Sequence, residues 1–220
     1  MNVLELFAGS RSFSKVAEKL GHNTFTSDIN NFDKIDYVTN IMDFNTKKVP
    51  FKPDFIWASV PCYTFSVASI GHHWKGGNRS YIPKTSSAYM GLAIAKKTIE
   101  IINHFNPKYY YIENPRGLLR KMEFMQNLPR HTIWYCQYQD DRAKPTDLWT
   151  NDKSWIPRPV CKNGNKDCHH QPAPRGSRTG TQGLKGNYER SIVPQELCYE
   201  ILENKAVSYT HLTLPTNREV

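Results

Sequence analysis

An α/β fold with a doubly wound, mostly parallel sheet is the fold class that this sequence predicts. The chain opens with an apolar strand over 2–7, a glycine turn, a helix over 12–20 and a second strand that ends at Asp28. This order of strand, glycine turn, helix and strand ending in an acid is typical of the first unit of a nucleotide-binding sheet. Strand-like and helical runs keep alternating further along, as expected for helices packed on a parallel sheet.

Each further element follows from apolar periodicity and from the turn residues that bound it. Strands are expected at 35–38, 54–59, 109–112, 132–137 and 147–150, and helices at 87–105, 116–122 and 194–203. The helix over 87–105 is the clearest, and its buried side is expected to carry Met90, Ile94, Thr98, Ile101 and Ile102. The polar, glycine-containing stretch 63–86 is predicted to be a long loop.

The composition indicates a basic, single-domain protein. A chain of 220 residues is long enough to bury one sizeable core. Lys and Arg number 29 against 20 Asp and Glu, which favours a polyanionic partner such as nucleic acid. The five cysteines are an odd number, and the sequence shows neither a signal peptide nor an apolar run long enough to cross a bilayer. We therefore expect no membrane partner and a reducing, cytoplasmic setting that keeps the cysteines as thiols.

Two polar motifs follow predicted buried strands: Pro61-Cys62 and Glu113-Asn114-Pro115. Because ligands of such sheets bind outside the carboxyl ends of the strands, both motifs are expected to face one crevice. A thiolate can add to a ring carbon, and a carboxyl in closed surroundings can share a proton because its pKa is raised. The motifs predict covalent catalysis with Cys62 as nucleophile, Glu113 as acid, and Asn114 in the turn that aims Glu113.

Together with Phe7-Ala8-Gly9, these motifs resemble the DNA cytosine-C5 methyltransferases over Val3 to about Leu202, and the run 144–151 resembles short phage-borne members. The resemblance implies a Rossmann-like, S-adenosylmethionine-dependent methyltransferase fold. It also implies methyl transfer to C5 of cytosine in double-stranded DNA, through a covalent Cys62–C6 adduct on a base flipped out of the duplex. Arg142 matches the arginine that approaches the target base. We expect a monomeric DNA-modification enzyme in a bacterial or phage-infected cell.

Two alternatives share part of this resemblance. The first is a tRNA cytosine-C5 methyltransferase, which uses the same chemistry on RNA. The second is a catalytically impaired protein that binds DNA or S-adenosylmethionine, because Ser10-Arg11-Ser12 replaces the family's second glycine cluster.

The resemblance also implies the methyl-donor site. The turn after the first strand lets the backbone approach a ligand, and the helix that begins at Ser12 is expected to direct its amides there. Asp28 is expected to bind ribose hydroxyls and Asp43 the adenine amine. The cofactor-binding residues are expected to be Phe7, Ala8, Gly9, Ser10, Asp28, Ile29, Asp43, Phe44 and Pro61.

The chain divides into four segments. Residues 1–150 are expected to form the S-adenosylmethionine-binding catalytic domain, 151–190 a small irregular target-recognition region, and 191–205 a closing helix. The last stretch, 206–220, shows no core periodicity and resembles translated sequencing-adaptor sequence, so we set it aside from the fold; a disordered C-terminus is the alternative.

A basic stretch within the recognition region is expected to follow a phosphate backbone. Between His169 and Tyr188 there is no acidic residue, and basic residues alternate with glycines and small hydroxyls. A solvated loop is the alternative. The expected nucleic-acid contacts are Ser66, Lys144, Arg175, Arg178 and Lys185.

Ligand types for zinc occur at Cys161, Cys168, His169 and His170, and Cys136 could join them in space. The interval between Cys161 and Cys168 is longer than that of a zinc knuckle, so we favour free thiols and no metal. A structural zinc site remains the alternative.

Overall fold

The computed structural model describes residues 1–77, 80–172, 184 and 186–210, and it shows the following helices and strands. The strands are β1 (Asn2–Leu6), β2 (Asn23–Asp28), β3 (Tyr37–Val38), β4 (Phe55–Ser59), β5 (Trp74–Gly77), β6 (Ser80–Pro83), β7 (Tyr109–Pro115), β8 (Arg130–Trp134) and β9 (Pro145–Thr150). The α-helices are α1 (Ser12–Lys19), α2 (Ile70–His73), α3 (Ser86–Phe105), α4 (Glu123–Gln126), α5 (Asn187–Ser191) and α6 (Gln195–Thr210). Short 3-10 turns lie at η1 (Ile41–Asp43), η2 (Thr46–Lys48), η3 (Leu119–Lys121) and η4 (Tyr135–Tyr138).

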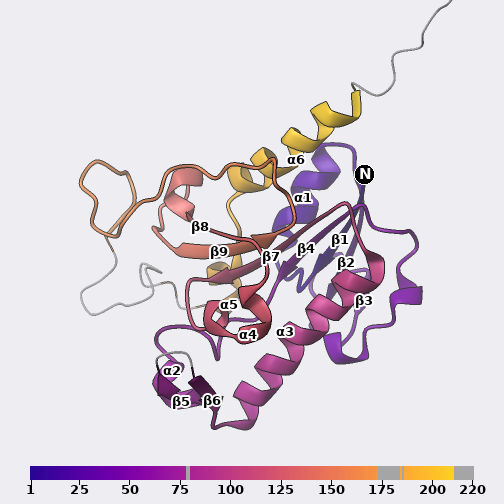
Figure 1. The fold of residues 1–220 in the computed structure, drawn as a ribbon. Coiled ribbons are helices and arrows are strands. Elements are labelled where there is room, and N and C mark those ends of the chain that lie inside the picture. The colour runs from indigo at the N-terminus through magenta and orange to yellow at the C-terminus, as the bar shows by residue number, and fades with distance from the viewer. Residues whose placement is uncertain (78–79, 173–183, 185, 211–220) are drawn as a thin grey trace, which may run out of the picture.

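The main sheet confirms the predicted fold class (Figure 1). Its strand order is β3-β2-β1-β4-β7-β9-β8. The strands from β3 to β7 pair in parallel, and β9 pairs antiparallel with both β7 and β8. The strand order reverses between β1 and β4, and ligands of doubly wound sheets bind above such a switch point.

Successive side chains of the central strands point to opposite faces of the sheet, and both faces are apolar. On one face Leu4, Ile56 and Ile112 pack in the core that α3 covers. On the other face Val3 and Trp57 pack with α1 and α6, which lie side by side (Figure 1). The result is a sandwich of helices, sheet and helices, so the strand ends are the part of the sheet left open to a ligand.

Glu5, on β1, caps the start of α1. This helix has no capping side chain of its own, and Arg11 precedes it in a left-handed conformation. The buried carboxylate of Glu5 instead accepts hydrogen bonds from the backbone N–H groups of Phe13 (3.3 Å) and Ser14 (2.8 Å). The expectation that α1 directs its first amides at a bound donor is therefore wrong for these two amides.

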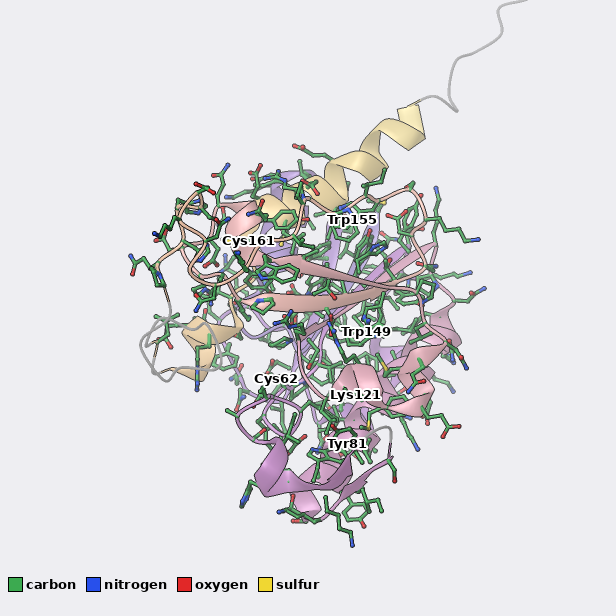
Figure 2. The ribbon with its side chains drawn as sticks, turned by 60° about the vertical axis from the view of Figure 1, so that its left-hand side comes forward. Cys62, Tyr81, Lys121, Trp149, Trp155 and Cys161 are labelled. Atoms are coloured by element: carbon green, nitrogen blue, oxygen red, sulfur yellow. The ribbon has the colours of Figure 1, made fainter. Side chains whose placement is uncertain are left out.

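The stretch 63–86 is more structured than predicted. It contains α2 and the β5–β6 hairpin, which form a small lobe at the bottom of Figure 1. At Gly76, where φ is +92°, a Cβ atom would lie 2.1 Å from the carbonyl oxygen of Ser80, so only glycine fits the turn. Lys121 approaches the ring of Tyr81 to 5.5 Å and connects the lobe to η3 (Figure 2).

The buried face of α3 also differs from the prediction. Met90 is 47% exposed, and the inward stripe carries smaller residues at Ala88, Gly91 and Ala95. A Cβ atom at Gly91 would lie 2.6 Å from Oγ1 of Thr64, so the glycine lets α3 approach the loop that follows β4. Thr98, Ile101 and Ile102 are buried as predicted, so the helix packs through these side chains as well as by close approach at its smaller residues.

Three further boundaries moved. The predicted strand 132–137 ends at Trp134, because Tyr135 donates its N–H to the carbonyl of Ala143 (3.1 Å) and starts η4. The predicted helix 116–122 is replaced by η3 and α4. The closing helix continues past Lys205 to Thr210, and α5 before it was not predicted. Among the described residues, no helix is both long and apolar enough to span a bilayer.

Glu5→Gln should flatten the pH dependence of stability. Burial raises the pKa of Glu5 from 4.5 to about 7, against the hydrogen bonds of Ser14 and Phe13 and the charge of Arg11. The unfolded chain releases this proton near pH 4.5, so the contribution of Glu5 to stability is complete below that pH. It is lost as the pH rises through about 7. The loss is roughly 3 kcal/mol, because one pKa unit corresponds to about 1.4 kcal/mol.

Urea unfolding at pH 5 and pH 8 measures this effect. The glutamine stays neutral and keeps an acceptor for the α1 amides, so the variant should lose much less stability at pH 8 than the wild type. Glu123→Gln, the same change at an exposed position, should keep the wild-type dependence. A wild-type slope in Glu5→Gln would contradict the role of burial.

Candidate active site

The parallel register of β4 and β7 brings the two predicted catalytic motifs to one edge of the sheet. Ser59 is the partner of Glu113 in this pair. Just beyond β4, Val60 donates its N–H to the carbonyl of Glu113 (3.2 Å), and Asn114 donates its side-chain amide to the carbonyl of Val60 (2.8 Å). Asn114 is fully buried, so it anchors the segment that carries Cys62 as well as the turn after Glu113.

The loop after Cys62 is braced from a second direction. The carbonyl of Cys62 accepts the N–H of Phe65 (3.0 Å), and the carbonyl of Phe65 accepts the N–H of Leu118 (2.7 Å). A Cβ atom at Gly117 would lie 2.3 Å from that carbonyl, so the close approach requires glycine. Cys62 therefore sits on a loop that is fixed by the chain on both sides of the end of β7.

Glu113 and Cys62 influence each other's protonation. Glu113 is 4% exposed, and burial raises the pKa of its carboxyl, which nearby Lys144 partly offsets. Burial also raises the pKa of the Cys62 thiol, and the negative charge of Glu113 raises it further, while Lys144 and Arg190 lower it. Such a pair carries one negative charge more readily than two. A proton on Glu113 therefore favours the Cys62 thiolate.

Tyr135 belongs to this site, and the sequence did not point to it. Its buried hydroxyl donates a hydrogen bond to Oε1 of Glu113 (2.9 Å) and lowers the pKa of that carboxyl. In the sequence Tyr135 stands in an apolar run, which is also where a tyrosine of the core would stand. Only the fold, in which η4 at the end of β8 returns to the end of β7, brings it to Glu113.

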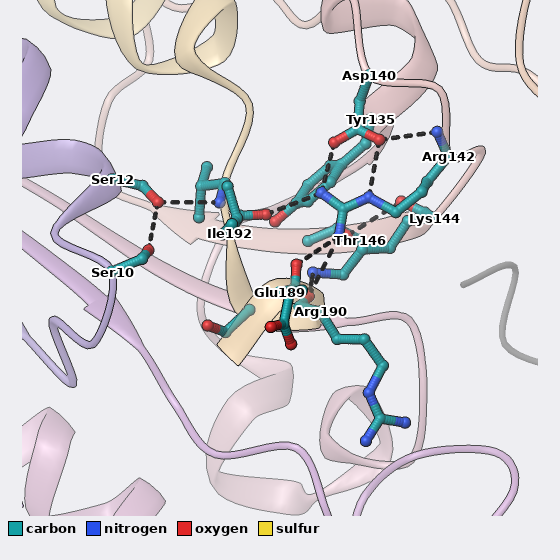
Figure 3. Close-up of polar contacts among 12 residues, drawn as sticks. Ser10, Ser12, Tyr135, Asp140, Arg142, Lys144, Thr146, Glu189, Arg190 and Ile192 are labelled. Carbon is teal, nitrogen blue, oxygen red and sulfur yellow. Dashed lines mark hydrogen bonds and ion pairs between the residues drawn. The ribbon is translucent and has the colours of Figure 1, made fainter. Parts of the chain in front are cut away.

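Lys144 lies buried inside the site, and its contact with nucleic acid stays a prediction. The residue is 5% exposed, its Nζ donates to the carbonyl of Arg190 (2.8 Å), and it lies 4.4 Å from the ring centroid of Tyr135 (Figure 3). Burial lowers the pKa of Lys144 and Glu113 raises it. The ammonium group is thus placed to balance the charge of the Cys62–Glu113 pair.

Arg142 is engaged by the protein, and its contact with the target base stays a prediction. Its guanidinium pairs with Asp140 (2.7 Å) and donates to the backbone carbonyls of Glu189 (3.2 Å) and Ile192 (3.0 Å). Figure 3 shows it between the loop 139–144 and the end of α5. Arg142 fastens α5 over the site, and Arg190 on α5 is a cation near Cys62 that the sequence did not single out.

The turn between β1 and α1 is hydrogen-bonded to the end of β2. Asp28 accepts the N–H of Gly9 (3.0 Å) and the N–H of Asn30 (2.8 Å). Phe7, Gly9 and Arg11 have φ values of +58°, +44° and +53°. Arg11 thus adopts a left-handed conformation that favours glycine. The turn has this positive φ value at Arg11 even though Ser10-Arg11-Ser12 stands where the family has glycines.

The residues around this turn fit S-adenosylmethionine. Asp28 offers a carboxylate to hydroxyl groups, and the neighbouring Ile29 is 63% exposed and offers an apolar surface to a flat ring. Phe7 and Pro61 are half-buried on the same strand ends. Ser10 bonds to Ser12 (2.6 Å), whose Oγ accepts the N–H of Val193 (3.2 Å), as Figure 3 shows.

Asp43 ends the 3-10 turn η1, and Phe44 follows it. Phe44 is buried in the α3-side core, 5.4 Å from the ring of Tyr37. Asp43 is exposed and lines a cavity of about 570 Å³ with Glu100 and His104 of α3, whose lining does not include Asp28 or Phe7. Thr39 donates its N–H to the carbonyl of Asp28 (2.9 Å) just before η1, and the contact of Asp43 with adenine stays a prediction.

The expected nucleic-acid contacts divide in two. Ser66 is half-buried near Cys62, and its hydroxyl lies 2.9 Å from that of Ser69. Arg175, Arg178 and Lys185 lie outside the described residues.

The predicted free thiols are not scattered. Cys136, Cys161, Cys168 and His170 gather in one cluster, whereas His169 approaches the carbonyl of Asp140 (3.1 Å). Figure 2 shows Cys161 well separated from Cys62, so this cluster is not part of the active site.

Comparison with known proteins agrees with the motifs. The family model described as C-5 cytosine-specific DNA methylase matches residues 1–128, which include both Cys62 and Glu113. A "Probable DNA (cytosine-5)-methyltransferase" of Frog virus 3 (isolate Goorha) is 29% identical over 218 residues, 92% of this chain and 99% of the viral protein.

Two solved structures resemble the fold at 17% sequence identity. They are the Dnmt2 methyltransferase of S. pombe, with a TM-score of 0.45 and coverage of 72% of this chain and 52% of that chain, and a DNMT2 mutant of Spodoptera frugiperda, with a TM-score of 0.41 and coverage of 78% and 57%. The chain spans only about half the length of these structures. On the match that contains both catalytic motifs, the chain belongs to the family of C-5 cytosine-specific DNA methylases.

Proposed function

We propose that this protein transfers the methyl group of S-adenosylmethionine to C5 of cytosine in double-stranded DNA. The observation that carries the proposal is the parallel register that sets Cys62 and Glu113 at one sheet edge, where both can reach a single base. The family match and the name of the viral relative support DNA as the substrate. A base inside the duplex stack exposes neither face of its C5–C6 bond to a nucleophile, so the target cytosine is flipped out.

Cys62 begins the reaction by adding its thiolate to C6. The new C–S bond saturates the C5–C6 bond and pushes electrons towards N3 and C5. Protonated Glu113 shares its proton with N3, and the same proton removes the charge that opposes the Cys62 thiolate. When bound, S-adenosylmethionine supplies an electrophilic methyl group. After C5 has accepted the methyl group, loss of the C5 proton to a base expels Cys62 and restores the ring.

The donor is held, in this proposal, by the turn Phe7–Gly9 with Asp28 and Ile29. The exposed apolar surface of Ile29 beside the carboxylate of Asp28 supports this location. DNA is bound in part by Arg175, Arg178 and Lys185, as the basic stretch without acids suggests.

Cys62→Ser should abolish methyl transfer while leaving folding and donor affinity nearly unchanged, because a hydroxyl is a much weaker nucleophile than a thiolate. Labelled methyl incorporation into mixed-sequence duplex DNA and into tRNA measures it. The wild type should label DNA, and Cys198→Ala, which removes a thiol in the α6 core, should retain activity. Label in tRNA alone would support the RNA alternative, and donor binding without label in either substrate would support the impaired one.

Tyr135→Phe should shift the alkaline side of the pH–rate profile to higher pH. The Tyr135 hydroxyl stabilises the ionised carboxylate, so removing it raises the pKa of Glu113 and keeps the active, protonated form to higher pH. The pH dependence of kcat measures the shift.

Tyr138→Phe is the matched control for this change. Tyr138 is buried in the same turn η4, but its hydroxyl accepts the N–H of Arg158 and does not touch Glu113. Its variant should keep the wild-type pH profile. Identical profiles for the two variants would contradict the assigned contact.

Asp28→Ala should weaken S-adenosylmethionine binding by roughly 1–3 kcal/mol, about 5- to 150-fold, if its carboxylate holds a ribose hydroxyl. Isothermal calorimetry measures the affinity. Asp33→Ala removes the same charge from an exposed position of the next loop and should bind the donor normally. Unchanged affinity in Asp28→Ala would place the donor elsewhere.

A further inference from the structure

Four metal-ligand side chains converge outside the active site. Cys136 comes from η4, and Cys161, Cys168 and His170 come from the irregular segment that follows β9. One ligand atom from each lies within 4.8 Å of all the others, and Nδ1 of His170 lies 3.8 Å from Sγ of Cys161. The fold thus brings Cys161 and Cys168 together, although the long interval between them in the sequence argued against a metal site.

The dimensions of this cluster suit a tetrahedral zinc ion. Zn–S bonds of about 2.3 Å and Zn–N bonds of about 2.0–2.1 Å give ligand–ligand distances of roughly 3.6–3.8 Å in a tetrahedron. The observed separations reach this range after a contraction of about 1 Å or less. Three thiolates with one imidazole are a closed set of the soft ligands that zinc takes in structural sites.

Amide groups surround the sulfur atoms as they do in metal sites. Nε2 of Gln137 lies 3.9 Å from Sγ of both Cys136 and Cys168, and Nδ2 of Asn165 lies 3.7 Å from Sγ of Cys161. Such donors stabilise thiolates bound to a metal. One adjustment is needed: the N–H of Gly164 lies 3.2 Å from Nε2 of His170, and this contact must open when Nδ1 binds zinc and the proton moves to Nε2.

Trp155 packs the start of the segment 151–172 into the α6-side core, but among the described residues the part next to the cluster has only a small apolar core. From 151 to 172 the structure shows neither a helix nor a strand. Arg158 fixes the start through Glu196 and Glu200, but next to the cluster the apolar contacts are limited to a few residues that include Ala143 and Trp134. Short irregular segments with so small a core are commonly stabilised by a disulfide or a metal.

We propose that Cys136, Cys161, Cys168 and His170 bind a structural zinc ion. The ion joins the irregular segment 151–172 to η4. The site replaces the sequence-based prediction of no metal. It lies beside the loop 139–144, because Gln171 donates its N–H to the carbonyl of Asp141 (3.0 Å), so it also supports the loop from which Arg142 holds α5.

Metal content tests the proposal without reference to methylation. The full chain is produced without a histidine tag, with zinc in the medium and a reductant throughout, and its zinc is measured by inductively coupled plasma mass spectrometry. We expect one zinc ion per chain. Exchange with Co²⁺ should give the strong visible bands of tetrahedral cobalt and the near-ultraviolet charge-transfer bands of thiolate ligands.

Matched variants separate the ligands from their neighbours. His170→Ala and Cys161→Ser should lose the bound zinc, whereas His169→Ala and Cys198→Ala should retain it. The cobalt spectrum of the wild type needs no variant, so a variant that fails to fold leaves the test intact. A wild-type chain that binds neither ion under reducing conditions would overturn the proposal. So would equal zinc loss in His169→Ala and His170→Ala, or a disulfide among the three cysteines in the chain as isolated.

Discussion

The hydrogen bond between Asn114 and the carbonyl of Val60 is the interaction on which the active site depends most. It is fully buried, and it joins the two strand ends that carry Glu113 and Cys62. A buried amide left without its partner costs about 1–3 kcal/mol, so the two ends are held together by more than the ladder of the sheet. Pro61 and Cys62 then extend from an anchored point, and the turn at Gly117 holds the far side of the same loop.

The second constraint is electrostatic. A buried carboxyl, a buried ammonium group and a thiol share one small volume, and the net charge of this group decides whether Cys62 can ionise. Lys144 keeps its place because its Nζ also donates to a carbonyl at the end of α5. The ionisation of Cys62 and Glu113 at the strand ends is therefore linked, through Lys144, to α5, the helix at the end of the predicted recognition region in sequence.

The segment 189–193 connects three parts of the molecule. Arg142 and Lys144 hold its carbonyls, and Val193 donates its N–H to Ser12 at the start of α1, beside the donor turn (Figure 3). A movement of this segment would alter the contacts of two places: the turn between β1 and α1, and Lys144 beside the Cys62–Glu113 pair.

The sequence predicted the features that depend on strand ends. The parallel strands of the main sheet, the acid at the end of β2, and the pairing of Cys62 with Glu113 follow from apolar runs that stop at polar motifs. It missed Tyr135 and Arg190, because their places depend on how η4 and α5 fold back towards the end of β7. It also missed the capping of α1 by Glu5, since a carboxylate in a strand can satisfy amides of a helix that begins later in the chain.

The most direct test of the covalent mechanism is to trap it. Duplex DNA that carries 5-fluorocytosine is incubated with the protein and S-adenosylmethionine, and the denatured complex is digested and mapped by mass spectrometry. Fluorine cannot leave C5 as a proton does, so the peptide that contains Cys62 should carry a methylated, fluorinated dihydrocytosine on its sulfur. Two results would contradict the assignment of Cys62 as nucleophile. One is the absence of an adduct when 5-fluorocytosine stands at a site that the protein methylates in ordinary DNA, and the other is an adduct on another residue.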